Sequence, residues 1–245
     1  MNHLDLFSGI GGFALAARWA GFTTVAFCEI EPYCQKVLRK NFGKGITIHN
    51  DIKELDGTRY AGTITVLTGG FPCQPYSIAG KRRGSADPRA LWKEMFRVIR
   101  EAKPAWVIGE NVANFANMGL DDACSDLESE GYEVQPFIIP AVAVGAPHER
   151  KRVFMVAHAD AGYGKRGERV QSRYGILPKA VTRDHIDETG VSEGDWRNSW
   201  KAEPDVGRIS DGIPARVDRL RVLGNAIVPQ VVYPIFCFIK RLEWT

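Results

Sequence analysis

One cysteine is placed where a nucleophile would be useful. Cys73 lies in GGFPCQPYS (residues 69–77), directly after the apolar run TITVLT. Prolines on both sides stiffen the backbone around the thiol, and ligand sites in open α/β sheets lie at the carboxyl ends of strands. Lone cysteines are usually small buried hydrophobes. The rigid, polar flanks and the basic residues that follow, which favour the thiolate, point to a nucleophile instead.

Two further motifs carry ionisable side chains beside apolar runs. Glu110, in GENVAN, follows AWVI and is expected at the same sheet edge as Cys73. A carboxyl group there can have a raised pKa and donate a proton, with a helix-capping or salt-bridged glutamate as an even alternative. Arg150 and Arg152 alternate just before a strand, so their forked donors could face one ligand. On that motif alone, surface arginines are the commoner case.

A glycine-rich turn near the N-terminus predicts a nucleoside cofactor. DLFSGIGG (residues 5–12) joins a strand to a helix, and Glu29 ends the next strand about twenty residues later, where a carboxylate can hold ribose hydroxyls. The spacing is not GxGxxG and no lysine follows, which disfavours a pyrophosphate and excludes a P-loop. A merely tight strand-to-helix turn is the alternative.

Alternating elements must position these residues. Strands are expected at 4–7, 23–29, 63–68, 105–108, 132–139 and 153–158, and helices at 13–20, 32–42, 91–100, 121–130, 216–223 and 228–242. This alternation predicts a doubly wound, mostly parallel α/β sheet. Residues 159–214 are polar and lack apolar periodicity. We therefore expect a catalytic and cofactor-binding domain at 1–158, a small region at 159–214, and a segment at 215–245 that returns to the first domain.

Composition narrows the class of protein. The 245 residues are 44% hydrophobic and 25% charged, which is ordinary globular composition and excludes collagen-like, disordered and disulfide-scaffold classes. We expect no membrane span and no secretory signal. Five spread cysteines without a CxxC pair predict reduced thiols in the cytoplasm and no metal site.

The net charge of +3 conceals an uneven distribution. Residues 80–100 and 161–183 each carry +5, and residues 184–212 carry −5. Basic segments beside glycines suit a polyanion-binding surface, and solvated faces that cancel are the alternative.

In their order along the chain, these motifs resemble those of cytosine-5 DNA methyltransferases. The matching segments are DLFSGIGG, the strand ending in Glu29, Asp51-Ile52, GGFPCQPYS, Leu91-Trp92, GENV, Arg150-x-Arg152 and GNAIVPQ. A PCQ loop followed by ENV and RxR is a highly specific set. The resemblance implies a Rossmann-like methyltransferase sheet with one late antiparallel strand, S-adenosylmethionine as donor, and a cytosine in duplex DNA as acceptor.

The resemblance also implies a role for each motif. Cys73 would add to carbon 6 of cytosine, Glu110 would protonate ring nitrogen 3, and Arg152 would hold the carbonyl oxygen, with Arg150 close to the backbone. The target base would be flipped out of the helix. The implied cofactor-binding residues are Phe7, Ser8, Gly9, Ile10, Gly11, Gly12, Glu29, Ile30, Asp51, Ile52, Pro72, Leu91, Asn225 and Ala226. The expected DNA-binding residues are Gln74, Ser77, Lys81, Arg82, Arg83, Arg166, Arg169 and Arg173.

Two departures from the family pattern concern the second half of the chain. His148 stands where members often have glutamine, and the recognition region at 159–214 is unusually short. We expect this region to choose a DNA site of roughly four to six base pairs. We also expect a monomer without an obligate protein partner, in a bacterial cytoplasm. Phage origin and a companion restriction endonuclease are left open.

Four other functions are alternatives to DNA cytosine methylation. An RNA cytosine-5 methyltransferase would use the same nucleophile and cofactor. A dinucleotide-dependent oxidoreductase would explain the glycine turn and Glu29 but leaves PCQ and ENV without a role. An inactive DNA-binding relative has no support because every catalytic position is intact. A thiol hydrolase built on Cys73 and His148 lacks an orienting partner.

Overall fold

The computed structural model describes residues 1–72, 90–159 and 223–243 of the chain. Within them, seven strands form one sheet in the order β3-β2-β1-β4-β5-β7-β6. The strands are β1 (Asn2–Leu6), β2 (Thr23–Cys28), β3 (Thr47–His49), β4 (Val66–Gly70), β5 (Trp106–Val112), β6 (Tyr132–Pro140) and β7 (Lys151–Ala159). Neighbours from β3 to β5 are parallel, whereas β7 runs antiparallel to both β5 and β6. The sheet is therefore mostly parallel with one reversed strand.

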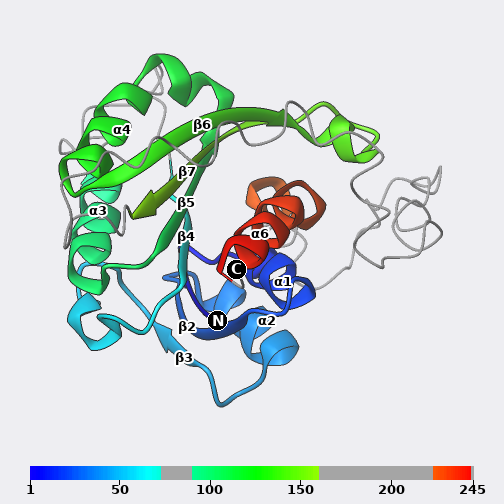
Figure 1. The fold of residues 1–245 in the computed structure, drawn as a ribbon. Coiled ribbons are helices and arrows are strands. Elements are labelled where there is room, and N and C mark those ends of the chain that lie inside the picture. The colour runs from blue at the N-terminus through cyan, green and yellow to red at the C-terminus, as the bar shows by residue number, and fades with distance from the viewer. Residues whose placement is uncertain (73–89, 160–222, 244–245) are drawn as a thin grey trace, which may run out of the picture.

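Helices cover both faces of this sheet (Figure 1). The helices are α1 (Gly12–Trp19), α2 (Pro32–Phe42), α3 (Ala90–Ala102), α4 (Leu120–Ser129) and α6 (Pro229–Glu243), with short 3-10 helices η1 (Gly57–Tyr60), η2 (Ala113–Asn117) and η3 (Ala141–Val144). α1 and α6 pack against one face, and α3 and α4 pack against the other. The doubly wound architecture predicted from the alternating pattern is confirmed.

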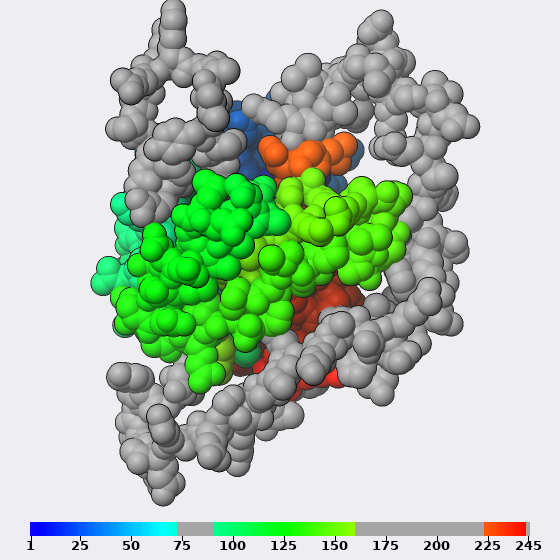
Figure 2. All heavy atoms as spheres, turned by 90° about the horizontal axis from the view of Figure 1, so that it is seen from above, coloured from blue at the N-terminus to red at the C-terminus, as the bar shows by residue number. Residues whose placement is uncertain are grey.

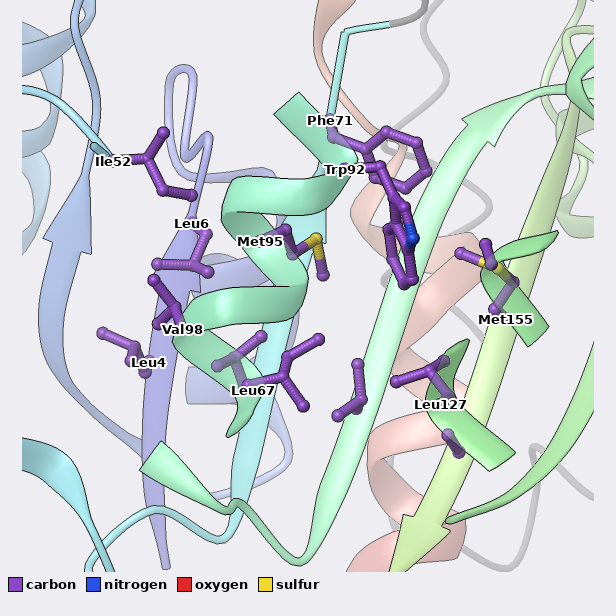
Figure 3. Close-up of a cluster of buried hydrophobic side chains, with 14 of the residues drawn as sticks. Leu4, Leu6, Ile52, Leu67, Phe71, Trp92, Met95, Val98, Leu127 and Met155 are labelled. Carbon is purple, nitrogen blue, oxygen red and sulfur yellow. The ribbon is translucent and has the colours of Figure 1, made fainter. Parts of the chain in front are cut away.

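Helix α3 shows how the sequence forms this packing. Its buried residues Trp92, Met95, Val98 and Ile99 recur every three or four positions, which places them on one helical face. Figure 3 shows Trp92, Met95 and Val98 directed at the sheet, with Ile52 at one end of the same cluster. The helix is therefore fixed against β1 and β4, whose carboxyl ends carry two of the predicted motifs.

Most predicted elements agree with the structure, and the differences have physical reasons. α2 has the predicted bounds, but the three-residue strand β3 is too short to give a sequence signal. The interpretation of Glu110 as following its strand is wrong. β5 extends to Val112 because β7 pairs with it along its whole length, so Glu110 lies inside the strand. Apart from Ala159 and Leu223, the predicted recognition region and the helix at 216–223 lie outside the described residues.

Among the described residues, no helix is both long and apolar enough to cross a bilayer. The same residues contain no group of three His, Cys, Asp or Glu side chains that could hold a metal ion.

Candidate active site

The carboxyl ends of β1, β2, β4 and β5 bring the predicted motifs together. In the sheet register, Leu6 lies beside both Cys28 and Gly69, and Gly70 lies beside Glu110. The turn after β1, the end of β2 and the segment leading to the cysteine therefore share one edge. Cys73 itself, three positions after Gly70, lies outside the described residues.

Glu110 and Arg152 form an ion pair at this edge. Arg152 Nε lies 2.8 Å from Glu110 Oε1, and the two side chains are only 21% and 13% exposed. Burial raises the pKa of Glu110, while the charges of Arg152 and Arg150 act in the opposite direction. Of these opposed influences, burial is the larger, so the pKa of Glu110 is raised although a cation lies beside it. That combination suits a general acid.

Two neighbours of Glu110 shape its surroundings. A Cβ atom at Gly70 would lie 3.1 Å from Glu110 Oε2, so the missing side chain leaves room for the carboxylate. Asn111 is almost fully buried and donates from Nδ2 to the Phe71 carbonyl oxygen at 3.1 Å. Asn111 thus fixes the backbone that leads to Cys73. The ENV motif contains this residue, but no sequence pattern indicates its bond to Phe71.

The turn after β1 is tied directly to Glu29. Gly9 N–H donates to Glu29 Oε2 at 2.6 Å, and Glu31 N–H donates to Oε1 at 2.8 Å. Burial raises the pKa of Glu29, while these backbone donors oppose the shift. Phe7 adopts a φ of 51°, a conformation that non-glycine residues rarely take outside functional or strained sites. The predicted glycine turn and Glu29 therefore lie together.

The three glycines of this turn serve different purposes. Nothing lies within 4 Å of a Cβ built at Gly9, so its surroundings are open. A Cβ at Gly11 would lie 2.5 Å from the Phe42 ring, and one at Gly12 would lie 2.3 Å from Ile227 Cγ2. Gly11 and Gly12 therefore permit close packing, and Gly9 alone of the three leaves open space for a ligand.

A network of hydrogen bonds among buried polar side chains supports β1, the strand that leads into the turn. His3 Nδ1 lies 2.9 Å from Thr24 Oγ1, and His3 Nε2 lies 2.8 Å from Thr68 Oγ1, which donates to Asp5 Oδ1 at 2.8 Å. Burial lowers the pKa of His3 to about 3 and raises that of Asp5 well above its ordinary value. The sequence analysis did not find this network.

Other residues predicted to bind the cofactor flank the turn. Ile30 is 65% exposed directly after Glu29, whereas Ile52 is buried behind Asp51. Gln35 Nε2 on α2 donates to the Glu29 carbonyl oxygen at 2.6 Å and to Asn50 Oδ1 at 3.0 Å. The ends of β2 and β3 are therefore held side by side. The exposed apolar side chain of Ile30 offers a surface on which a flat heterocycle could pack.

Arg150 does not point the same way as Arg152. Its Nη2 atom donates to the carbonyl oxygens of Gly224 and Ala226, both at 2.8 Å, and its φ is 33°. Of the two interpretations of this motif, the one in which both arginines face one ligand is therefore not what this structure shows. In the view from above (Figure 2), the orange atoms of the segment that starts at Leu223 lie against the yellow-green atoms around β7. Arg150 thus holds the backbone on both sides of Asn225 against the start of β7.

Several predicted site residues cannot be placed in this arrangement because they lie outside the described residues. They are Cys73, Gln74, Ser77, Lys81, Arg82, Arg83, Arg166, Arg169 and Arg173. The residues that the structure does bring to one edge are Phe7, Gly9, Glu29, Pro72, Glu110 and Arg152, with Asn225 joined to them through Arg150.

The fold and this edge define a methyltransferase sheet of the Rossmann-like kind. Residues 1–188 match the family model of C-5 cytosine-specific DNA methylases. The chain belongs to this family.

Known relatives agree with that assignment. The Type II methyltransferase M.Eco47II of Escherichia coli is 37% identical over 160 residues, which cover 63% of this chain and 38% of the relative. M.HhaI of Haemophilus parahaemolyticus, also a Type II methyltransferase, is 34% identical over 161 residues, which cover 64% and 48%. A solved putative DNA modification methyltransferase encoded within an E. coli prophage is 26% identical with a TM-score of 0.54, covering 65% of this chain and 47% of that one. The chain thus matches about 38–48% of these proteins' length.

Proposed function

We propose that the protein methylates carbon 5 of a flipped-out cytosine in duplex DNA, with S-adenosylmethionine as donor and Cys73 as nucleophile. The observation that carries the proposal is the partly buried pair of Glu110 and Arg152, 2.8 Å apart. Glu110 lies on β5, the strand beside β4, which leads to Cys73. Ring nitrogen 3 and the carbonyl oxygen at carbon 2 are adjacent on cytosine. A proton donor and a cationic hydrogen-bond donor at this separation suit those two atoms.

The residues around the glycine turn fit the proposed cofactor. Gly9 leaves open space, Glu29 presents a buried carboxylate for ribose hydroxyls, and Ile30 offers an exposed apolar surface for the adenine. Phe7, Asp51 and Ile52 would complete the adenine side. The turn itself, with Leu91, Asn225 and Ala226, would enclose the methionine part. When bound, the cofactor supplies an electrophilic methyl group.

The chain's own groups would then act on the base in sequence. The Cys73 thiolate forms a bond to carbon 6 while Glu110 gives its proton to nitrogen 3, so that the electron pair reaching carbon 5 is stabilised without a full charge in the ring. Carbon 5 would use this pair to bond the methyl group of S-adenosylmethionine, and S-adenosylhomocysteine would leave with the electron pair of the broken sulfur–methyl bond. Loss of the carbon-5 proton then restores the double bond and expels Cys73, and nitrogen 3 returns its proton to Glu110.

The proposal is tested by methyl incorporation into duplex DNA and transfer RNA in parallel. Cys73→Ala should abolish transfer but keep S-adenosylhomocysteine binding, and duplexes containing 5-fluorocytosine should be trapped covalently by the unmodified protein alone. Glu110→Gln should lower kcat by about 10²–10⁴-fold, the usual contribution of general acid catalysis. Full activity of Cys73→Ala would refute the covalent mechanism. Methylation of RNA alone would replace the proposed substrate.

We further propose that residues 159–214 choose the DNA sequence. The first half of this region carries the +5 charge and contains Arg166, Arg169 and Arg173, whose side chains can contact phosphates or guanine edges. Its grafting from a relative with another target site should transfer that relative's methylation pattern, as read by sequencing of methylated cytosines. An active graft that keeps the original pattern would assign recognition elsewhere.

A further inference from the structure

Arg97 on α3 lies behind the turn that follows β3. Its Nη2 atom donates to the Ile52 carbonyl oxygen at 2.6 Å, and Nη1 donates to the Leu55 carbonyl oxygen at 3.0 Å. The motifs identified in the sequence do not include this residue. The turn it holds is nevertheless the one that carries Asp51 and Ile52.

The guanidinium group is itself held in one orientation. Nε lies 3.0 Å from Glu94 Oε2, and Nη1 lies 2.8 Å from Glu101 Oε2. The same Glu101 oxygen accepts the Gly57 N–H at 2.8 Å, so the pair also fixes the end of the turn. Arg97 is 34% exposed, and its fork is pre-organised before any ligand arrives.

Apolar packing fixes only part of the turn. The Ile52 and Leu55 side chains are buried in the cluster that α3 shares with β1 (Figure 3). These contacts set the distance between the turn and the helix, but packing is less directional than hydrogen bonds from a rigid fork. Arg97 therefore orients the peptide groups of Ile52 and Leu55. Within the same turn, Asp51 Oδ1 accepts the Lys53 N–H at 3.0 Å, so the position of the Asp51 carboxylate depends on the backbone of this turn.

We propose that Arg97 is a positioning residue for the adenine end of the cofactor site, orienting the turn from Asp51 to Leu55 without touching the ligand. The inference rests on the proposed function. It assigns a second role to α3, because Leu91, which is expected to flank the cofactor, lies in the first turn of the same helix.

The test compares Arg97→Met and Arg97→Lys with Arg100→Met in the full chain. Arg100 lies on the same helix and pairs with Glu130, but it has no hydrogen bond to the turn in the described structure. S-adenosylhomocysteine binding is measured by calorimetry, and kcat and KM for S-adenosylmethionine are measured on duplex DNA. A hydrogen bond to a charged group is worth about tenfold or more in an equilibrium constant. We expect Arg97→Met to weaken binding about 10–100-fold with kcat changed less than about threefold, and Arg97→Lys to fall between.

Binding of a second ligand distinguishes a positioning role of Arg97 from a general loss of folded protein. S-inosylhomocysteine replaces the adenine amino group by a carbonyl, so the unmodified protein should discriminate against it. Arg97→Met should shrink that discrimination, whereas a smaller folded fraction weakens both ligands equally. Equal losses for both ligands, an unchanged Kd, or the same effect in Arg100→Met would overturn the inference.

The outcomes also distinguish this inference from the function on which it rests. If the unmodified protein binds no S-adenosylhomocysteine, the proposed function fails. If it binds and Arg97→Met binds equally well, only the role of Arg97 fails. Should Arg97→Met not fold, Arg97→Lys carries the same comparison, because it keeps the charge beside Glu94 and Glu101 but loses the fork.

Discussion

Substitution of Gly70 by alanine should disturb catalysis without disturbing the fold. The new Cβ atom would lie 3.1 Å from Glu110 Oε2, and the next nearest atom, in the Phe13 ring, is at an ordinary 3.9 Å. The backbone of Gly70 has no positive φ, so alanine introduces no strain there. The carboxylate end of Glu110 is the only group that must move, by a few tenths of an ångström.

The size of the effect follows from that displacement. A misplacement of about 1 Å in reacting groups can cost about 10²-fold in rate, so a shift of roughly a third of that should lower kcat about three- to tenfold. This is far less than the loss expected for Glu110→Gln. KM for S-adenosylmethionine should change little, because Gly70 and Glu110 lie on the side of the edge assigned to the base.

The assay is steady-state methyl incorporation together with a thermal melt. Gly45→Ala is the matched control, since nothing lies within 4 Å of its Cβ and its φ is not positive. Both variants should melt near the temperature of the unmodified protein. If Gly70→Ala keeps full kcat while remaining folded, the placement of the Glu110 carboxylate does not limit the reaction, and its proposed role as the proton donor loses its geometric support.

Three more predictions use other contacts of the site. Gly12→Ala should destabilise the protein by about 1–3 kcal/mol, the usual result of overpacking, because its Cβ would overlap Ile227. Gly9→Ala should weaken S-adenosylhomocysteine binding, and because Gly9 has a φ of 54° it should also lower the denaturant midpoint. Arg152→Met removes a charge that lowers the pKa of Glu110, so the acid stays protonated to higher pH and the alkaline limb of the kcat–pH profile should move upward; a downward move would contradict the pairing. Arg150→Lys should raise KM for the cofactor more than it lowers kcat, since one ammonium replaces the donors to Gly224 and Ala226; a pure kcat effect would place Arg150 at the base instead.

Sequence patterns predicted the elements whose signals are local. The apolar periodicity of residues 91–100 and the glycines after the first strand depend on neighbours in the chain, and both were located correctly. β3 was missed because only three residues pair with β2. Glu110 was predicted to follow its strand because the polar residues of GENV do not look like a strand. They nevertheless pair with β7, which comes about forty residues later in the chain.

Sequence patterns did not predict the contacts between side chains and backbone groups that are far away in the sequence. Alternation along a strand left open that Arg150 and Arg152 face one ligand, but the positive φ at Arg150 breaks the alternation just before β7. Asn111 and Arg97 bond to carbonyl groups 40 to 45 positions away. Such bonds depend on how the sheet and helices assemble, and neither residue type nor spacing reveals them.

These distant bonds make the site depend on the end of the chain. Arg150 holds carbonyl oxygens 74 and 76 positions later, and Ile227 fills the space that Gly12 leaves open. α6, which follows directly, packs on α1 and closes the second core of the sheet. The glycine turn and the arginine motif are therefore joined through residues 224–227 rather than to each other. A protein of this family can accordingly vary the region between β7 and Gly224 in length, as long as the two ends of that region return to these contacts.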